Sequence, residues 1–151
     1  NTGFDDGNVI DLAKAYDGKD GQVFDAYAVD MRIAGGGGGL YSSIEDLLIW
    51  NRSILNHQLL DKATIDLMQT RHFEIDGSNA SGYGLFLAVL DDMNPPQHLI
   101  YHAGGGPGVQ AMNTYFVEQK IGLIMMSNLN DKKRFTPVRE QLYDVILNDK
   151  K

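Results

Sequence analysis

The sequence predicts an α+β fold: an antiparallel sheet of about four sequential strands, packed with helices that include one at the C-terminus. After a glycine run, apolar side chains recur at helical spacing, whereas from Tyr83 onward they form short, nearly continuous runs typical of strands covered on both faces. A second helical pattern closes the chain. Helices, strands and a final helix therefore follow one another, unlike the regular alternation of a βαβ fold.

The length of 151 residues suits a single domain. We expect residues 1–82 to be mostly helices and loops, and residues 83–151 to hold the antiparallel strands and the C-terminal helix. The chain begins Asn1-Thr2-Gly3-Phe4, without an initiator methionine, and its start resembles the middle of a protein. We therefore expect residues 1–151 to be one partial domain.

The first half of the chain contains one extended segment, a glycine run and two helices. Val23–Met31 alternates in part between apolar and polar residues and is expected to be extended. After Gly35–Gly39, Ser42-Ser43-Ile44-Glu45 fits a capping box with Ser42 as the N-cap of a helix over about residues 43–56. Asp61 is expected to cap a second helix. The apolar stripe of the first helix comprises Ile44, Leu47, Leu48, Ile54 and Leu55, and that of the second Ile65 and Met68.

The second half contains the sheet. Thr136-Pro137 fits the start of the closing helix, because proline is favoured at the first helical position. The expected strands are Tyr83–Leu90, Leu99–His102, Val109–Val117 and Ile121–Met126. The stripe expected to be buried on the closing helix is Val138, Leu142, Val145 and Ile146.

Composition excludes several function classes. The formal net charge of −7 and the absence of a long basic cluster argue against nucleic acid or an anionic membrane as a partner. No segment has the roughly 18 apolar residues of a membrane span. Cysteine is absent, which excludes disulfides, thiolate metal sites and a cysteine nucleophile.

Neither a cofactor nor a metal is expected. Gly35–Gly39 lacks the Gly-Lys-Ser/Thr ending of a phosphate-binding loop, so a nucleotide-binding module is a remote alternative to a close backbone crossing before a helix. His98 and His102 share a strand face, but four residues of strand separate them by about 13 Å, too far for one ion. Asp17-Gly18-Lys19-Asp20-Gly21 lacks the oxygen spacing of a calcium loop, and turn chemistry explains it.

The candidate site is the run His102-Ala103-Gly104-Gly105-Gly106-Pro107-Gly108. A histidine at a strand end is often structural, but glycines after it allow a ligand to approach the backbone closely. We expect His102 to face an anionic or carbonyl group, with the Gly105 amide behind it.

Several stretches, in order along nearly the whole chain, resemble the serine β-lactamase-like family, which includes class C β-lactamases, D-alanyl-D-alanine carboxypeptidases and related esterases. The stretches that carry the resemblance are Asn1–Phe4, Ala34–Leu47 with Trp50, Leu59–Met68, Gly82–Leu85, His102–Gly105 and Gly122–Asn128. The order and number of these matches make the resemblance more specific than any single motif.

The resemblance implies an acyl-transfer site. In this family a serine of an S-x-x-K motif attacks a carbonyl, a Y-x-N motif assists, and a K-T-G or H-x-G motif lines the site on a strand. His102-Ala103-Gly104 stands where the third motif is expected, so Gly105 would supply one oxyanion-hole amide. Histidine instead of lysine resembles the esterase and peptidase branches. Relatives are often exported, which implies a periplasmic or exported location.

The chain departs from the family in lacking the nucleophile motif. None of its serines has a lysine three residues later, and no Y-x-N stands in a fitting place. The resemblance therefore implies the C-terminal part of a β-lactamase/transpeptidase-like fold, from a serine hydrolase that acts on a small amide or ester, and inactive alone. The alternative is a non-catalytic binding module of the same fold. Without the family's N-terminal strands an exposed sheet edge is expected to self-associate or exchange strands.

Overall fold

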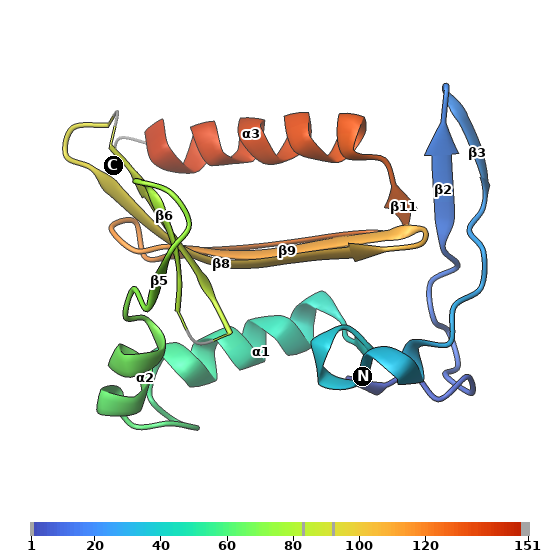
Figure 1. The fold of residues 1–151 in the computed structure, drawn as a ribbon, viewed down its shortest axis with the longest axis horizontal. Helices are drawn as coiled ribbons and strands as arrows, with labels where there is room; N and C mark the ends of the chain where they lie inside the picture. Colours follow the sequence, from blue (N-terminus) through green and yellow to red (C-terminus); the bar gives the residue numbers. More distant parts are fainter. Residues whose placement is uncertain (1, 83, 92, 149–151) are drawn as a thin grey trace. The chain divides into compact units, whose positions relative to one another are not determined.

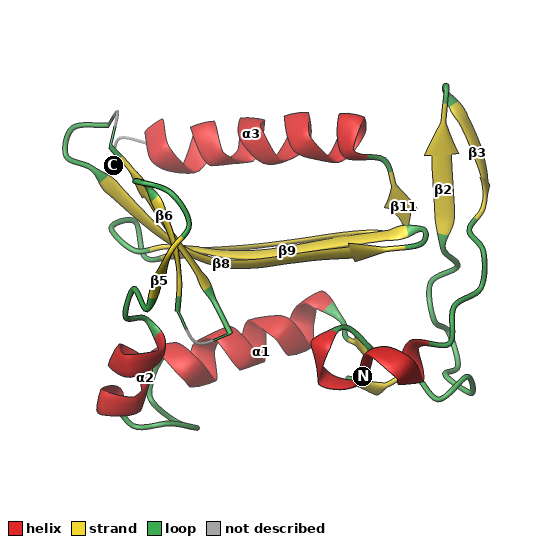
Figure 2. Cartoon of the chain, viewed as in Figure 1, coloured by secondary structure: helices red, strands yellow, loops and turns green. Residues whose placement is uncertain are grey.

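The computed structural model describes residues 2–82, 84–91 and 93–148, whose helices and strands are drawn in Figures 1 and 2. The chain divides into two compact units. Unit 1 comprises Asn1–Leu47, Ala103–Ala111 and Met125–Lys151, and unit 2 comprises Leu48–His102 and Met112–Ile124. No helix among the described residues combines the length and apolarity needed to cross a bilayer.

A six-stranded sheet is the main β-structure, with the strand order β10-β9-β8-β7-β6-β5. Each strand is hydrogen-bonded to its neighbour in sequence, and the pairs β5–β6, β6–β7 and β7–β8 are antiparallel. Its strands are β5 (Phe73–Glu74), β6 (Asn79–Ser81), β7 (Phe86–Leu90), β8 (Gln97–Gly106), β9 (Val109–Phe116) and β10 (Ile121–Ser127).

This sheet confirms the predicted α+β class and the four sequential strands, which are β7 to β10. β5 and β6 were not predicted, because strands of two and three residues are too short to show an alternating pattern. The predicted strand start at Tyr83 lies outside the described residues.

Two small sheets belong to unit 1. One pairs β1 (Gly3–Phe4) with β4 (Leu40–Tyr41), and the other has the order β11-β2-β3. The strands of the second sheet are β2 (Tyr16–Lys19), β3 (Gln22–Asp25) and β11 (Leu129–Asn130). Asp20 and Gly21 join β2 to β3 with φ of 52° and 82°, the backbone that a two-residue hairpin turn requires. The turn expected from Asp17–Gly21 is thus confirmed, whereas the extended segment predicted over Val23–Met31 ends at Asp25.

The glycine run forms a close backbone crossing. The 3₁₀ helix η1 (Met31–Gly37) contains most of it, and the Gly39 amide donates to the Gly35 carbonyl oxygen at 2.8 Å. A Cβ on Gly39 would lie 2.5 Å from the Met31 carbonyl oxygen, so only glycine fits. The run is a compact connection into β4 and α1, as the sequence predicts.

Two helices follow near their predicted positions. α1 spans Ile44–Leu55, but its cap is Ser43, not Ser42, because the Ser43 hydroxyl accepts from the Asp46 amide at 3.1 Å. Ser42 instead hydrogen-bonds Thr2 at 2.7 Å. α2 spans Lys62–Met68 and is capped by Asp61, as predicted. The hydrogen bond from the Thr64 amide to Asp61 also lowers the pKa of that carboxyl.

The C-terminal helix is present but begins earlier than predicted. α3 spans Lys132–Asn148, and the Asp131 carboxylate accepts from the Lys133 amide at 3.0 Å. Asp131 therefore supplies the N-terminal cap, and Pro137 lies inside the helix instead of at its first position. The predicted start was wrong because the Asp131 carboxylate accepts from the Lys133 amide in the first turn as well as a threonine hydroxyl would.

The buried core belongs to unit 2. Its alternation is clearest on β9, where every second residue from Gln110 to Phe116 is buried. The buried apolar residues are Ile65, Ala80, Leu87, Ala88, Leu99, Met112 and Phe116. A reciprocal pair of amide hydrogen bonds, 2.8 and 2.9 Å long, joins Asn51 on α1 to Asn113 on β9.

Unit 1 is different, because none of the buried apolar residues belongs to it among the described positions. Val138, Leu142 and Val145 of α3 are 50%, 37% and 66% exposed, so the stripe predicted to be buried is largely open. On β3, Val23 and Phe24 are about half exposed. Within the described residues, unit 1 thus has no fully closed apolar core of its own.

Candidate active site

The predicted site residues His102, Gly104 and Gly105 lie in the second half of β8. β8 has β7 on one side and β9 on the other, but the ladder with β7 ends at the pair Phe86–Tyr101. β8 continues to Gly106, and all residues from His102 to Gly105 are exposed. Within the described residues, the interior strand of a sheet thus becomes an open edge where the site was predicted. Its backbone amides and carbonyls on that side are available to an extended ligand.

His102 is the last residue of unit 2 on this strand. Its side chain lies next to an aromatic ring, that of Phe86. Its ring lies 5.5 Å from that of Phe86, tilted by 39°. Phe86 also stacks on Tyr101, with ring centroids 5.5 Å apart and an interplanar angle of 30°. The His102 side chain makes no hydrogen bond within the described part of the chain. Both ring nitrogens are thus open to a ligand, while one ring face rests near Phe86.

The glycines that follow belong to unit 1 and differ from one another. A Cβ on Gly104 would meet nothing within 4 Å, so packing does not require glycine there. A Cβ on Gly105 would lie 3.2 Å from the Val109 carbonyl oxygen and 3.8 Å from Cγ of Gln110 on β9. Glycine therefore lets β9 approach at Gly105 and leaves the backbone uncovered at Gly104.

The end of the run is fixed by a contact that the sequence analysis missed. Pro107 and Gly108 connect β8 to β9, and the Gly108 amide donates to Asp17 Oδ1 on β2 at 3.0 Å. Gly108 has a φ of 73° and is buried. Asp17 was interpreted only as part of a turn, and 91 residues separate it from Gly108, so no local pattern indicates their contact.

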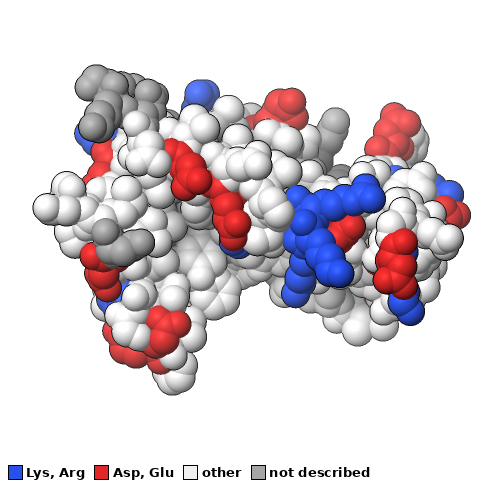
Figure 3. All heavy atoms as spheres, turned by 90° about the horizontal axis from the view of Figure 1, so that it is seen from above, with Lys and Arg blue, Asp and Glu red and all other residues white. Residues whose placement is uncertain are grey.

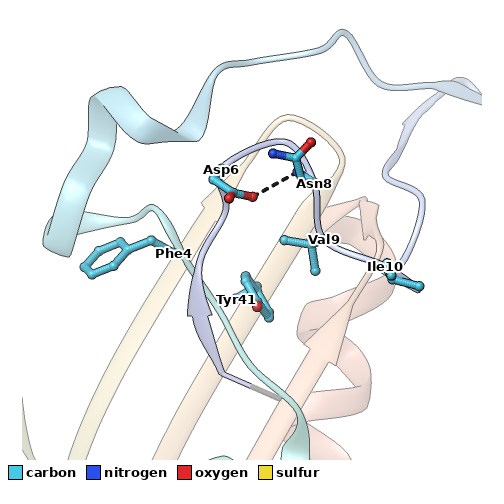
Figure 4. Close-up of a pocket in the computed structure, with 6 residues that line it drawn as sticks. All are labelled: Phe4, Asp6, Asn8, Val9, Ile10 and Tyr41. Atoms are coloured by element: carbon cyan, nitrogen blue, oxygen red, sulfur yellow. Dashed lines mark hydrogen bonds between the residues drawn. The ribbon is translucent and has the colours of Figure 1, made fainter.

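Two hollows among the described residues, one next to Phe4 and one next to Met125, are lined by residues other than the predicted site. A hollow of about 410 Å³ in unit 1 is lined by Phe4, Asp6, Asn8, Val9, Ile10 and Tyr41 (Figure 4). Phe4 and Ile10 are 60% and 86% exposed, so this hollow is shallow. We assign it no ligand, because its polar side chain Asp6 is already engaged by the Asn8 amide at 2.9 Å.

Charges do not gather around β8. Lys132, Lys133 and Arg134 follow one another at the start of α3, and Asp131 pairs with Arg134 at 3.2 Å. Figure 3 shows a basic patch on the face seen from above, with acidic side chains dispersed around it.

Comparisons with known proteins place this fold. The Beta-lactamase family model matches residues 3–147. No curated protein sequence matches the chain. Among solved structures, a penicillin binding protein from Bacillus halodurans has a TM-score of 0.71 at 18% identity, over 93% of this chain and 44% of its own.

Two further structures are similar in fold. A D-amino acid amidase from Ochrobactrum anthropi SV3, complexed with L-phenylalanine amide, has a TM-score of 0.72 at 21% identity, over 90% of this chain and 42% of its own. An octameric penicillin-binding protein homologue from Pyrococcus abyssi has a TM-score of 0.65 at 22% identity, over 84% of this chain and 30% of its own. The chain thus spans less than half the length of these proteins. Because the family model covers almost all of its residues, the chain belongs to the beta-lactamase family.

Proposed function

We propose that residues 1–151 are one partial domain of a serine hydrolase and form one wall of its acyl-transfer site. The open edge of β8 from His102 to Gly105 carries this proposal, because there the backbone can pair with a substrate. A serine outside these residues attacks the carbonyl carbon of an amide or ester. The carbonyl oxygen becomes an oxyanion that accepts a hydrogen bond from the Gly105 amide, and the amine or alcohol leaves as the acyl-enzyme forms.

His102 orients or polarises the substrate in this scheme. It is exposed, has no hydrogen-bond partner among the described residues, and stands on the same strand as Gly105. A small amide is the favoured substrate class, since a structural neighbour is a D-amino acid amidase described with an amino acid amide.

The claim that the nucleophilic serine lies outside residues 1–151 can be tested by measuring hydrolase activity. We expect residues 1–151 alone to turn over neither nitrocefin, p-nitrophenyl acetate nor phenylalanine amide, because no serine in them belongs to an S-x-x-K motif. The full-length protein is expected to hydrolyse at least one of the three, with an acyl adduct on a serine outside these residues in mass spectrometry.

Two results would contradict the proposal. Turnover by the 151-residue chain itself would place the nucleophile within it. A full-length protein without S-x-x-K and without an acyl adduct would favour the non-catalytic binding module, which the absence of that motif here also allows.

We also propose that further polypeptide covers unit 1. Its apolar side chains on β3 and α3 are largely exposed. β10, whose residues from Met125 onward belong to unit 1, is a sheet edge of seven residues without charge or proline. Such an edge pairs readily with another strand. The neighbour from Pyrococcus abyssi is described as octameric, so the cover can come from a second copy as well as from the same protein.

Self-association of the isolated chain is the expected consequence. In sedimentation velocity the weight-average mass of residues 1–151 should rise with concentration in the micromolar to millimolar range. Lys substituted for Leu123 or Met125 on β10 should reduce that rise. A monomer at every concentration would contradict the proposal.

A further inference from the structure

The tip of the β8–β9 hairpin is held by β2. The Gly108 amide donates to Asp17 Oδ1 at 3.0 Å, and the Tyr16 amide donates both to the Gly108 carbonyl oxygen at 3.3 Å and to that of Asn128 at 2.9 Å. A hydrogen bond from a backbone amide to a carboxylate is among the stronger kinds. Both polar groups of the Gly108 backbone are therefore bound by consecutive residues of one strand.

The same contact is tightly packed. A Cβ on Gly108 would lie 2.5 Å from the Ala26 Cβ, 2.7 Å from the Ala15 Cβ and 2.7 Å from the Tyr16 nitrogen. The Ala26 amide donates to the Ala15 carbonyl oxygen at 3.1 Å, which links the two residues that pack against Gly108. All of these residues belong to unit 1. The space around Gly108, at the tip of the β8–β9 hairpin, thus accommodates only glycine.

The glycines before the tip need such an anchor. Gly104, Gly105 and Gly106 have no side chains with which to pack, and glycine has more backbone freedom to lose than any other residue. Among the described residues, their strand also has no β7 partner along this stretch. The position of the Gly105 amide therefore depends on β9 and on how the turn at Gly108 is held.

We propose that Asp17 is a positioning residue: by binding the Gly108 amide it holds the Gly105 amide in place to donate to the oxyanion. This inference rests on the proposed function of Gly105. Asp17 itself touches no reacting atom, and its effect passes through Gly106 and Pro107, the two residues between Gly105 and Gly108.

The test compares two substitutions of Asp17 in the full-length protein. Asp17→Asn keeps an oxygen that can accept from the Gly108 amide, whereas Asp17→Ala removes it. Asp25→Ala is the matched control, because Asp25 lies on the same hairpin and pairs with Lys14 at 2.7 Å, whereas the carboxylate that binds the Gly108 amide is that of Asp17. The readouts are the ¹⁵N–¹H resonance of Gly105, hydrogen exchange at Gly108, and kcat and KM separately.

Asp17→Ala is expected to shift the Gly105 resonance, to speed exchange at Gly108 at least tenfold and to lower kcat about 10- to 100-fold, the penalty typical of small misplacements. KM should change less than twofold, because the oxyanion exists only beyond the ground state. Asp17→Asn and Asp25→Ala should retain the wild-type resonance and most of kcat.

An unshifted Gly105 resonance in Asp17→Ala would overturn the proposal, as would an equal loss of kcat in Asp25→Ala, which would mark a general effect of the hairpin. If Asp17→Ala fails to fold, Asp17→Asn decides: wild-type exchange at Gly108 supports the proposal, and rapid exchange contradicts it. A shifted Gly105 resonance in a protein without hydrolase activity would leave the positioning role intact and refute the proposed function.

Discussion

Replacing Gly108 by alanine is expected to destabilise unit 1 by about 2–4 kcal/mol, from a left-handed backbone conformation and from overpacking together. At a φ of 73° the Cβ of an alanine already raises the free energy of the folded backbone. Here that Cβ would also overlap Ala15, Ala26 and the Tyr16 nitrogen at 2.5–2.7 Å. The overlapping atoms are backbone or Cβ atoms, which cannot move aside by rotating a side chain. Ala15, Tyr16 and Ala26 must therefore move away from the hairpin turn at Gly108.

Urea titration of the purified chain measures this change, with hydrogen exchange at the Tyr16 amide as the local readout. Gly21→Ala is the control: Gly21 has a φ of 82° in the same unit, and a Cβ there meets nothing within 4 Å. It should cost only about 1 kcal/mol, the backbone component. Equal costs at the two positions would show that the close contacts at Gly108 contribute nothing.

Replacing His102 by alanine should lower kcat/KM of the full-length enzyme by about 100-fold or more, the usual contribution of a side chain that polarises or protonates a reacting group. Stability should change by less than about 0.5 kcal/mol, because the side chain is exposed and the described residues offer it no hydrogen bond. The loss of rate would then be chemical and not a consequence of unfolding.

His98→Ala is the matched control for this experiment. His98 stands on the same strand, but its ring binds Glu118 at 2.6 Å, and it lies within the part of β8 that pairs with β7. Its removal should leave kcat/KM unchanged. His102→Lys should keep part of the activity, since lysine is the family's alternative in this motif by the resemblance described above. Equal losses at His98 and His102 would contradict the assigned role.

Local signals predicted the elements whose caps and periodicity are complete within a few residues. α2 begins after Asp61 as expected, and β7 to β10 coincide with continuous or alternating apolar runs. Where two residues can serve as a cap, the sequence does not choose between them: Ser43 caps α1 instead of Ser42, and Asp131 replaces Thr136. The choice depends on which side chain has another partner, as Ser42 has in Thr2.

Helical periodicity identified the apolar face of α3 but not its surroundings. Val138, Leu142 and Val145 share that face, as predicted, yet each is more than a third exposed. An apolar stripe shows which side of a helix avoids water. It does not show whether the polypeptide that packs on that side lies within these 151 residues.

The sequence by itself determined the α+β class, the order of the central strands and, through the ordered motifs from Ala34 to Asn128, the resemblance that the Beta-lactamase match bears out. These depend on short-range periodicity, capping and composition. Only the tertiary structure decided that β7 begins at Phe86, so that among the described residues β8 has no β7 partner from His102 onward, and that Asp17 holds Gly108. The reason is physical: strand ends and docked turns depend on contacts between segments up to 91 residues apart, whose energies no local pattern encodes.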